Sequence, residues 1–243
     1  FSTLVYAIRE GRTIYNNLKK TIIASLTSNG GELAIVLLGL AGVALFGWPI
    51  PILVIQILAI DLLAEILPLT ALTFDPGSRD LMTSPPRRQQ EHILNRYTMV
   101  EVLFLGFLMG ALGFVNFVVF MGRTGAELTV THVLYSRATT LSYATIVFCQ
   151  FANILSRRYN YDSFFNRNFW SNKKILWSIV ISIGLTMTVI YIPFINGFLG
   201  FAPLTVSDWV SVLAAAAIFL LAHEIIKAFK RSRRRVPETR VQK

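Results

Sequence analysis

The amino-acid sequence predicts an all-α polytopic membrane protein, folded as a six-helix transmembrane bundle. Hydrophobic residues make up 54% of the 243 residues and charged residues only 15%, whereas ordinary soluble domains carry about 25% charged residues. Six stretches are long and apolar enough to cross a bilayer, which takes about 20 residues in a helix. The formal net charge is +10. Nucleic-acid-binding proteins also carry such charge, but not apolar runs of this length, so we expect the lipid bilayer and no nucleic acid as partner.

The first three predicted spans follow from nearly uncharged runs. The run over 21–46 contains one charged residue, Glu32, and ends at a Gly-Trp-Pro turn. The second span, over 50–74, contains two carboxylates, and the third, over 97–121, is uncharged after Glu101. Glu101 lies near a span end, where we expect it at the membrane interface.

The last three predicted spans are separated by polar segments. Residues 138–156 carry no charge. The interval between Lys174 and Asp208 is also uncharged and longer than one span, so we place its helix at about 174–198. The final span covers about 208–229. We expect one transmembrane ion-transport domain over 21–229.

The basic residues predict the orientation of the bundle. All of the 23 Lys and Arg residues except Arg123 and Arg137 fall on the side that holds both chain ends, and such a bias marks the cytoplasmic side. We therefore expect cytoplasmic termini, in the plasma membrane. Residues 1–20 show apolar residues at helical spacing and predict a cytoplasmic stalk helix that continues into the first span. Residues 230–243 form a basic tail, which is a topology signal or, alternatively, binds anionic lipid.

Three carboxylates lie inside predicted spans: Glu32, Asp61 and Glu65. Each costs on the order of 2.5–3.5 kcal/mol near the bilayer centre, and no Lys or Arg lies at the same depth in the predicted spans. They must therefore hold protons, bind cations, or alternate between the two. Asp61 and Glu65 are four residues apart and share a helix face. Because oxygen ligands suit hard cations rather than zinc or copper, we predict these three carboxylates as metal ligands.

A proline in the second span adds to this prediction. Pro68 cannot donate a hydrogen bond to the carbonyl of Ala64. We therefore expect the helix to be unwound between Asp61 and Pro68, with a carbonyl oxygen left free beside the carboxylates.

Amide side chains lie at matching positions. Asn29 is three residues before Glu32 and shares its face. Gln150 and Asn153, three residues apart in the fourth span, supply further ligand oxygens or, alternatively, serve as buried amides that hold helices together. The predicted cation-binding set is Asn29, Glu32, Asp61, Glu65, Gln150 and Asn153.

The sequence contains none of the common catalytic motifs of soluble enzymes. There is no phosphate-binding glycine loop, no HExxH and no nucleophile elbow, so we predict no catalytic residue in this chain. The single cysteine, Cys149, excludes an internal disulfide and a multi-cysteine zinc site. Because the chain begins at Phe1 rather than Met, we expect it to be a piece of a longer polypeptide.

Several motifs in order carry a family resemblance. They are EGRTIYNNLKK (10–20), TSNGGE (27–32), IDLLAEILP (60–68), DLM (80–82) and PPR (85–87), with HE and a lysine at 223–227. This series resembles the C-terminal membrane half of a type II P-type cation-transporting ATPase, of the calcium-pump and sodium–potassium-pump branch.

The resemblance implies that the six spans are the fifth to tenth of ten and that residues 1–20 lead from the phosphorylation domain. By position, Asn29 and Glu32 match ligands of the fifth helix, and Asp61 and Glu65 match ligands of the sixth. Residues 80–87 would lie in a loop facing the phosphorylation domain. Gln150 and Asn153 match polar positions of the eighth helix.

The resemblance further implies the membrane ion-translocation domain of an ATP-driven cation pump. The transported cation would be Ca²⁺ or Na⁺/K⁺. ATP, Mg²⁺ and the phosphorylated aspartate would belong to the missing N-terminal part of the polypeptide, which carries the first four membrane helices and the actuator, phosphorylation and nucleotide domains. The alternatives are an autonomous six-helix cation channel or proton-coupled carrier, and a membrane scaffold that transports nothing.

Overall fold

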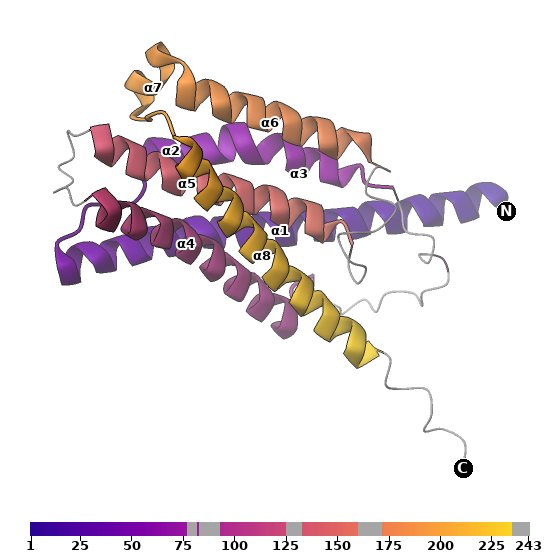
Figure 1. Cartoon of the computed structure of the whole chain (residues 1–243). Coiled ribbons are helices and arrows are strands. Elements are labelled where there is room, and N and C mark those ends of the chain that lie inside the picture. The colour runs from indigo at the N-terminus through magenta and orange to yellow at the C-terminus, as the bar shows by residue number, and fades with distance from the viewer. Residues whose placement is uncertain (77–81, 83–92, 125–132, 160–171, 235–243) are drawn as a thin grey trace.

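A computed structural model describes residues 1–76, 82, 93–124, 133–159 and 172–234, and every regular element in these ranges is a helix (Figure 1). Six of these helical segments are long and apolar enough to cross a membrane. The chain is an integral, multi-pass membrane protein with an all-α bundle, as the sequence predicted. Parts of the predicted 80–87 loop and of the 230–243 tail lie outside the described residues.

The first helix is far longer than a bilayer requires. Helix α1 runs over Ser2–Phe46, and its 45 residues span about 68 Å at 1.5 Å per residue, roughly twice the hydrocarbon thickness. Its N-terminal half therefore extends beyond the other helices (Figure 1). The helix ends at Gly47, whose φ of 67° is left-handed and whose N–H bonds to the carbonyl of Val43. The expected stalk and first span thus form one continuous helix.

The second helical segment corrects two expectations. It begins at Val54 rather than at residue 50, because Pro49 and Pro51 lack the N–H groups that a helix needs. The chain is also not unwound further on. Helix α2 (Val54–Ala59) continues through the π-helix η1 (Ile60–Glu65) into α3 (Ile66–Thr73).

The π-helical turns of η1 lie directly before Pro68. In an α-helix the proline ring would clash with the carbonyl four residues back. The wider turn gives that carbonyl room, so the segment absorbs the proline without breaking. Such π segments are frequent at functional sites.

Four helices long enough to cross a membrane and one short helix complete the described bundle: α4 (Arg96–Thr124), α5 (Val133–Arg157), α6 (Lys173–Tyr191), α8 (Val206–Arg234) and the short α7 (Pro193–Leu199). The expected 174–198 span is wrong at its end. The backbone is extended at Ile192, because Pro193 cannot continue the hydrogen-bond pattern of α6 but fits the first turn of a new helix.

Helix α5 is the centre of the bundle. Its most apolar window is 83% buried, whereas the corresponding windows of the other five segments are 22–39% buried. The surrounding helices instead expose large apolar side chains, such as Leu37, Leu103 and Leu221. A helix with one buried and one exposed apolar face suits contact with lipid.

Helices α1 and α4 meet along glycines. A Cβ added to Gly106 would come within 3.1 Å of the backbone of Gly30, and one added to Gly31 would lie 2.8 Å from the sulfur of Met109. Only glycine permits this close approach. The contact fixes the rotation of α1 immediately before Glu32.

The N-terminal half of α1 and the C-terminal end of α8 lie at the same end of the bundle, whereas α7 lies at the other (Figure 1). This arrangement agrees with an even number of crossings. The assignment of that end to the cytoplasm stays a prediction.

Candidate functional site

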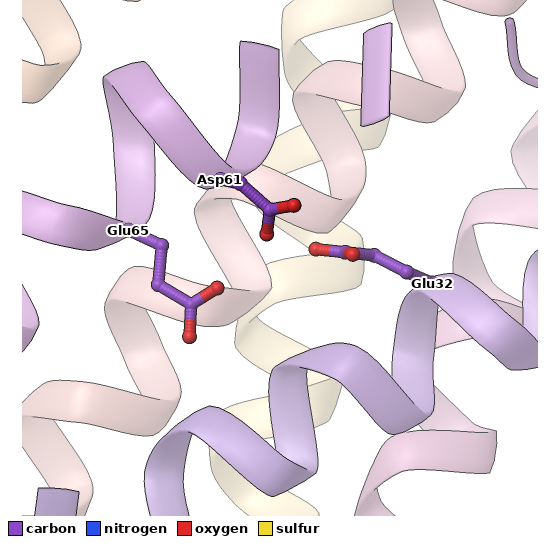
Figure 2. Close-up of side chains that lie close together, drawn as sticks. All are labelled: Glu32, Asp61 and Glu65. Carbon is purple, nitrogen blue, oxygen red and sulfur yellow. The ribbon is translucent and has the colours of Figure 1, made fainter. Parts of the chain in front are cut away.

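The three carboxylates from the predicted spans lie together. Glu32 projects from α1, and Asp61 and Glu65 project from η1, so that all three point toward one another (Figure 2). One carboxylate oxygen from each lies within 4.8 Å of the others. Glu32 and Glu65 are buried, and Asp61 is half-buried.

The helical geometry explains how residues so far apart in the sequence converge. Asp61 and Glu65 lie near the two ends of η1, within about one turn of each other. The glycine contact with α4 presents the neighbouring Glu32 toward η1. The π segment is therefore part of the site and not only an accommodation of Pro68.

Within the described residues, no lysine or arginine forms a salt bridge with any of the three carboxylates. Gln150 on α5 is a polar partner, and its Nε2 donates to Oε1 of Glu32 at 3.1 Å. Three carboxylates this close repel one another strongly when all are ionised in a medium of low dielectric. The arrangement therefore requires bound cations or protons.

Several buried oxygens beside the carboxylates have no hydrogen-bond partner among the described residues. They are Oε1 of Glu65, Oε1 of Gln150 and Oγ of Ser28. A buried polar atom without a partner costs about 1–3 kcal/mol. Together with the carboxylates they form an oxygen-only donor set, which fits a hard cation such as Ca²⁺, Mg²⁺ or Na⁺ and does not fit a soft metal.

The other predicted ligands divide into one that reaches the carboxylates and two that do not. Gln150 contacts Glu32 directly. Asn153 instead donates to the carbonyl of Ala24 at 3.1 Å and accepts a bond from Arg157 at 3.4 Å, so it ties α5 to α1. Asn29 is exposed on α1. A ligand role for these amides stays a prediction.

Sequence reasoning missed Ser28, although its position offered a signal. Ser28 is fully buried and lies four residues before Glu32, which places both on one face of α1. Its hydroxyl is therefore a candidate donor that the spacing alone could have indicated.

Glu101 lies near the N-terminal end of α4 and is not one of the three grouped carboxylates. It is buried on α4, pairs with Arg157 on α5 at 2.8 Å, and also pairs with Lys230 on α8. No spacing pattern in the sequence links these three positions. The cluster joins three helices and lies apart from the three carboxylates.

A family model described as "Cation transporting ATPase, C-terminus" matches residues 49–229. The chain belongs to this family. The matched residues include Asp61, Glu65 and Gln150, whereas Glu32 lies just before them. The resemblance seen in the sequence motifs is thereby confirmed.

Individual relatives extend the similarity over nearly the whole chain. A "Calcium-transporting ATPase" of Bacillus subtilis is 32% identical over 228 residues, covering 93% of this chain and 24% of the relative. "Calcium-transporting ATPase 1" of Bacillus cereus is 30% identical over 240 residues, covering 96% and 26%. "Calcium-transporting ATPase 4, endoplasmic reticulum-type" of Arabidopsis thaliana is 27% identical over 274 residues, covering 93% and 25%. The chain spans about a quarter of the length of these relatives.

Proposed function

We propose that this chain is the ion-translocating membrane domain of an ATP-driven P-type pump that transports Ca²⁺. The observation that carries the proposal is the convergence of Glu32, Asp61 and Glu65 from two transmembrane segments, with no cationic partner among the described residues. A purely structural role would leave three acids inside membrane-spanning segments uncompensated.

The charge and chemistry of the site favour Ca²⁺ over a monovalent ion. Ca²⁺ takes six to eight oxygen ligands in flexible geometry. Three carboxylates supply up to six oxygens, and Gln150 and Ser28 lie beside them. A divalent ion also offsets more of the repulsion than Na⁺ or K⁺ does. The relatives named above are all calcium-transporting ATPases.

The proposal assigns a second state to the same carboxylates. After the ion leaves, Glu32, Asp61 and Glu65 take up protons or counter-ions, because bare charges cannot persist together in low dielectric. The phosphorylated aspartate, ATP and Mg²⁺ belong to a segment upstream of Phe1, which we propose to carry the first four of ten helices and the cytoplasmic domains. Both termini of this chain then face the cytoplasm, and the protein lies in the plasma membrane.

The test is equilibrium binding of radioactive Ca²⁺ to the full-length protein and to its Glu32→Gln, Asp61→Asn and Glu65→Gln variants. We expect each variant to lose at least tenfold in Ca²⁺ affinity. Glu10→Gln is the matched control, because Glu10 is an exposed carboxylate on the same helix. Unchanged affinity in all three site variants would overturn the assignment.

A transport assay separates the pump from an autonomous carrier. Ca²⁺ uptake into inside-out vesicles should require ATP and should continue when proton and voltage gradients are collapsed. Uptake that depends on the gradients and does not require ATP would support the carrier instead.

A further inference from the structure

A cavity of about 940 Å³ is lined mostly by residues of α1, α4, α5 and α8. The N-terminal half of α1 and the C-terminal end of α8 diverge at this end of the bundle (Figure 1). None of the three site carboxylates is part of the cavity wall. We call it the basal cavity. It is thus a feature separate from the candidate cation site.

The described wall of the basal cavity is strongly cationic. Its charged residues are Lys19, Lys20, Arg157, Lys227, Lys230 and a single carboxylate, Glu101. That carboxylate is shared, since it pairs with both Arg157 and Lys230. Lys20 pairs with Asp75 and Lys227 with Glu224, which lie outside the wall. The five bases of the wall still outnumber these three acids, and the excess of positive charge favours an anionic occupant.

Buried polar groups also open onto the cavity. Lys227 is 2% exposed and donates to the carbonyl of Ser156 at 2.6 Å and to Glu224 at 3.0 Å. His223 is 1% exposed, and its Nδ1 has no hydrogen-bond partner among the described residues. A buried polar atom without a partner is costly. The wall therefore offers buried polar atoms that a polar ligand group could bind.

The cavity also has an apolar side. Val100, Phe104 and Ile226 line it, and Val100 and Phe104 are exposed on the outer face of α4. Tyr97, one turn before them, is exposed as well, and tyrosine is typical of the headgroup level. The basic wall thus lies where the apolar spans end, and the apolar wall continues toward the bilayer centre.

We propose that the basal cavity binds an anionic phospholipid. Its phosphate lies against Lys19 and Lys230, and an acyl chain follows Val100 and Phe104. Each lysine near a lipid phosphate strengthens binding about fivefold. The proposal depends on the membrane bundle alone and is independent of the transported ion.

The first experiment measures lipid selectivity of the full-length protein with spin-labelled phosphatidylglycerol and phosphatidylcholine. We expect wild-type protein to prefer phosphatidylglycerol. In the Lys19→Gln/Lys230→Gln variant, the preference for phosphatidylglycerol over phosphatidylcholine should fall about fivefold for each removed charge. The matched control is Lys173→Gln/Lys174→Gln, which removes two exposed charges outside the cavity and should keep the preference. The proposal would be overturned if both double variants lost the lipid preference equally, or if the wild-type protein showed no preference.

A second experiment needs no variant and separates a lipid from a free phosphate. A photoactivatable phosphatidylglycerol should label wild-type peptides that contain residues 97–104 and 223–230. Inorganic phosphate and glycerophosphoglycerol at millimolar concentration should leave that labelling intact, because they lack the acyl chain. Labelling elsewhere would contradict the site, and full displacement by inorganic phosphate would contradict a lipid occupant.

Discussion

The contact between Gln150 and Glu32 shows how one amide can shape a site of acids. Gln150 is fully buried on α5, and its Nε2 donates to Glu32 while its Oε1 has no partner among the described residues. The donated bond orients one oxygen of Glu32. The other end of the amide offers a neutral oxygen beside the three carboxylates.

Replacement of Gln150 by alanine should weaken Ca²⁺ binding by about tenfold, because a hydrogen bond to a charged group contributes about 1.5–3 kcal/mol and much of it acts on ligand orientation. The measurement is Ca²⁺ binding to the full-length variant. Cys149→Ala, a buried change at the next position, should leave the affinity within twofold. Equal effects of the two substitutions would mean that Gln150 matters only for packing.

At the scale of elements, the π-helix η1 decides how the second segment presents its ligands. In a regular α-helix each residue turns the chain by about 100°, so four residues would set the angle between the side chains of Asp61 and Glu65. The wider π turn rotates the chain less per residue and changes that angle. Pro68 makes the regular form unfavourable. The wider turn is therefore tied to the geometry of the site.

Pro68→Ala tests this link. The substitution restores an N–H and removes the ring clash, so the segment can revert to an α-helix. We expect at least tenfold weaker Ca²⁺ binding together with unchanged or higher thermal stability, measured on the same preparation. Pro193→Ala, at the break between α6 and α7, should leave Ca²⁺ affinity unchanged. Loss of stability in parallel with affinity would contradict the explanation.

The glycine contact between α1 and α4 predicts a second effect at this scale. Gly106→Ala places a methyl group about 3.1 Å from the backbone of Gly30 and the carbonyl of Thr27, which must shift. We expect a destabilisation of about 1–3 kcal/mol, seen as a lower unfolding temperature. Gly122→Ala is the matched control on the same helix, since a Cβ there meets nothing within 4 Å. That variant should be neutral or slightly more stable, and similar unfolding temperatures for the two would refute the close-packing argument.

At the scale of the whole molecule, the uncompensated carboxylates couple cation binding to folding. A ligand that binds the folded state alone adds about 2.7 kcal/mol at a hundred times its dissociation constant. We therefore expect Ca²⁺ to raise the unfolding temperature of the full-length protein in differential scanning calorimetry. Mg²⁺ should do so less, because it loses its water ligands reluctantly.

The Glu32→Gln/Glu65→Gln double variant should lose the stabilisation by Ca²⁺ and be more stable than wild type without the ion, since the repulsion is gone. A Ca²⁺-induced shift of the same size in this variant would mean that the ion binds elsewhere.

The number of membrane-spanning segments, the all-α fold and the three acids of the site could all be predicted from the sequence. These properties are local, because a span needs only length and hydropathy, and acids inside apolar runs can be recognised one by one. Even the pairing of Asp61 with Glu65 follows from spacing on one helix.

Contacts between segments far apart in the sequence could not be predicted and are known from the three-dimensional packing. Gln150 meets Glu32 across 118 positions of sequence, whereas Asn153 donates to the carbonyl of Ala24. Their shared helix face does not reveal this difference. Glu101 is the shared partner of two bases on other helices, which no spacing in the sequence indicates. The basal cavity likewise forms only where the ends of α4, α5 and α8 meet the middle of α1. Periodicity gives the face of a helix, whereas the neighbour of that face is set by how all the helices pack together.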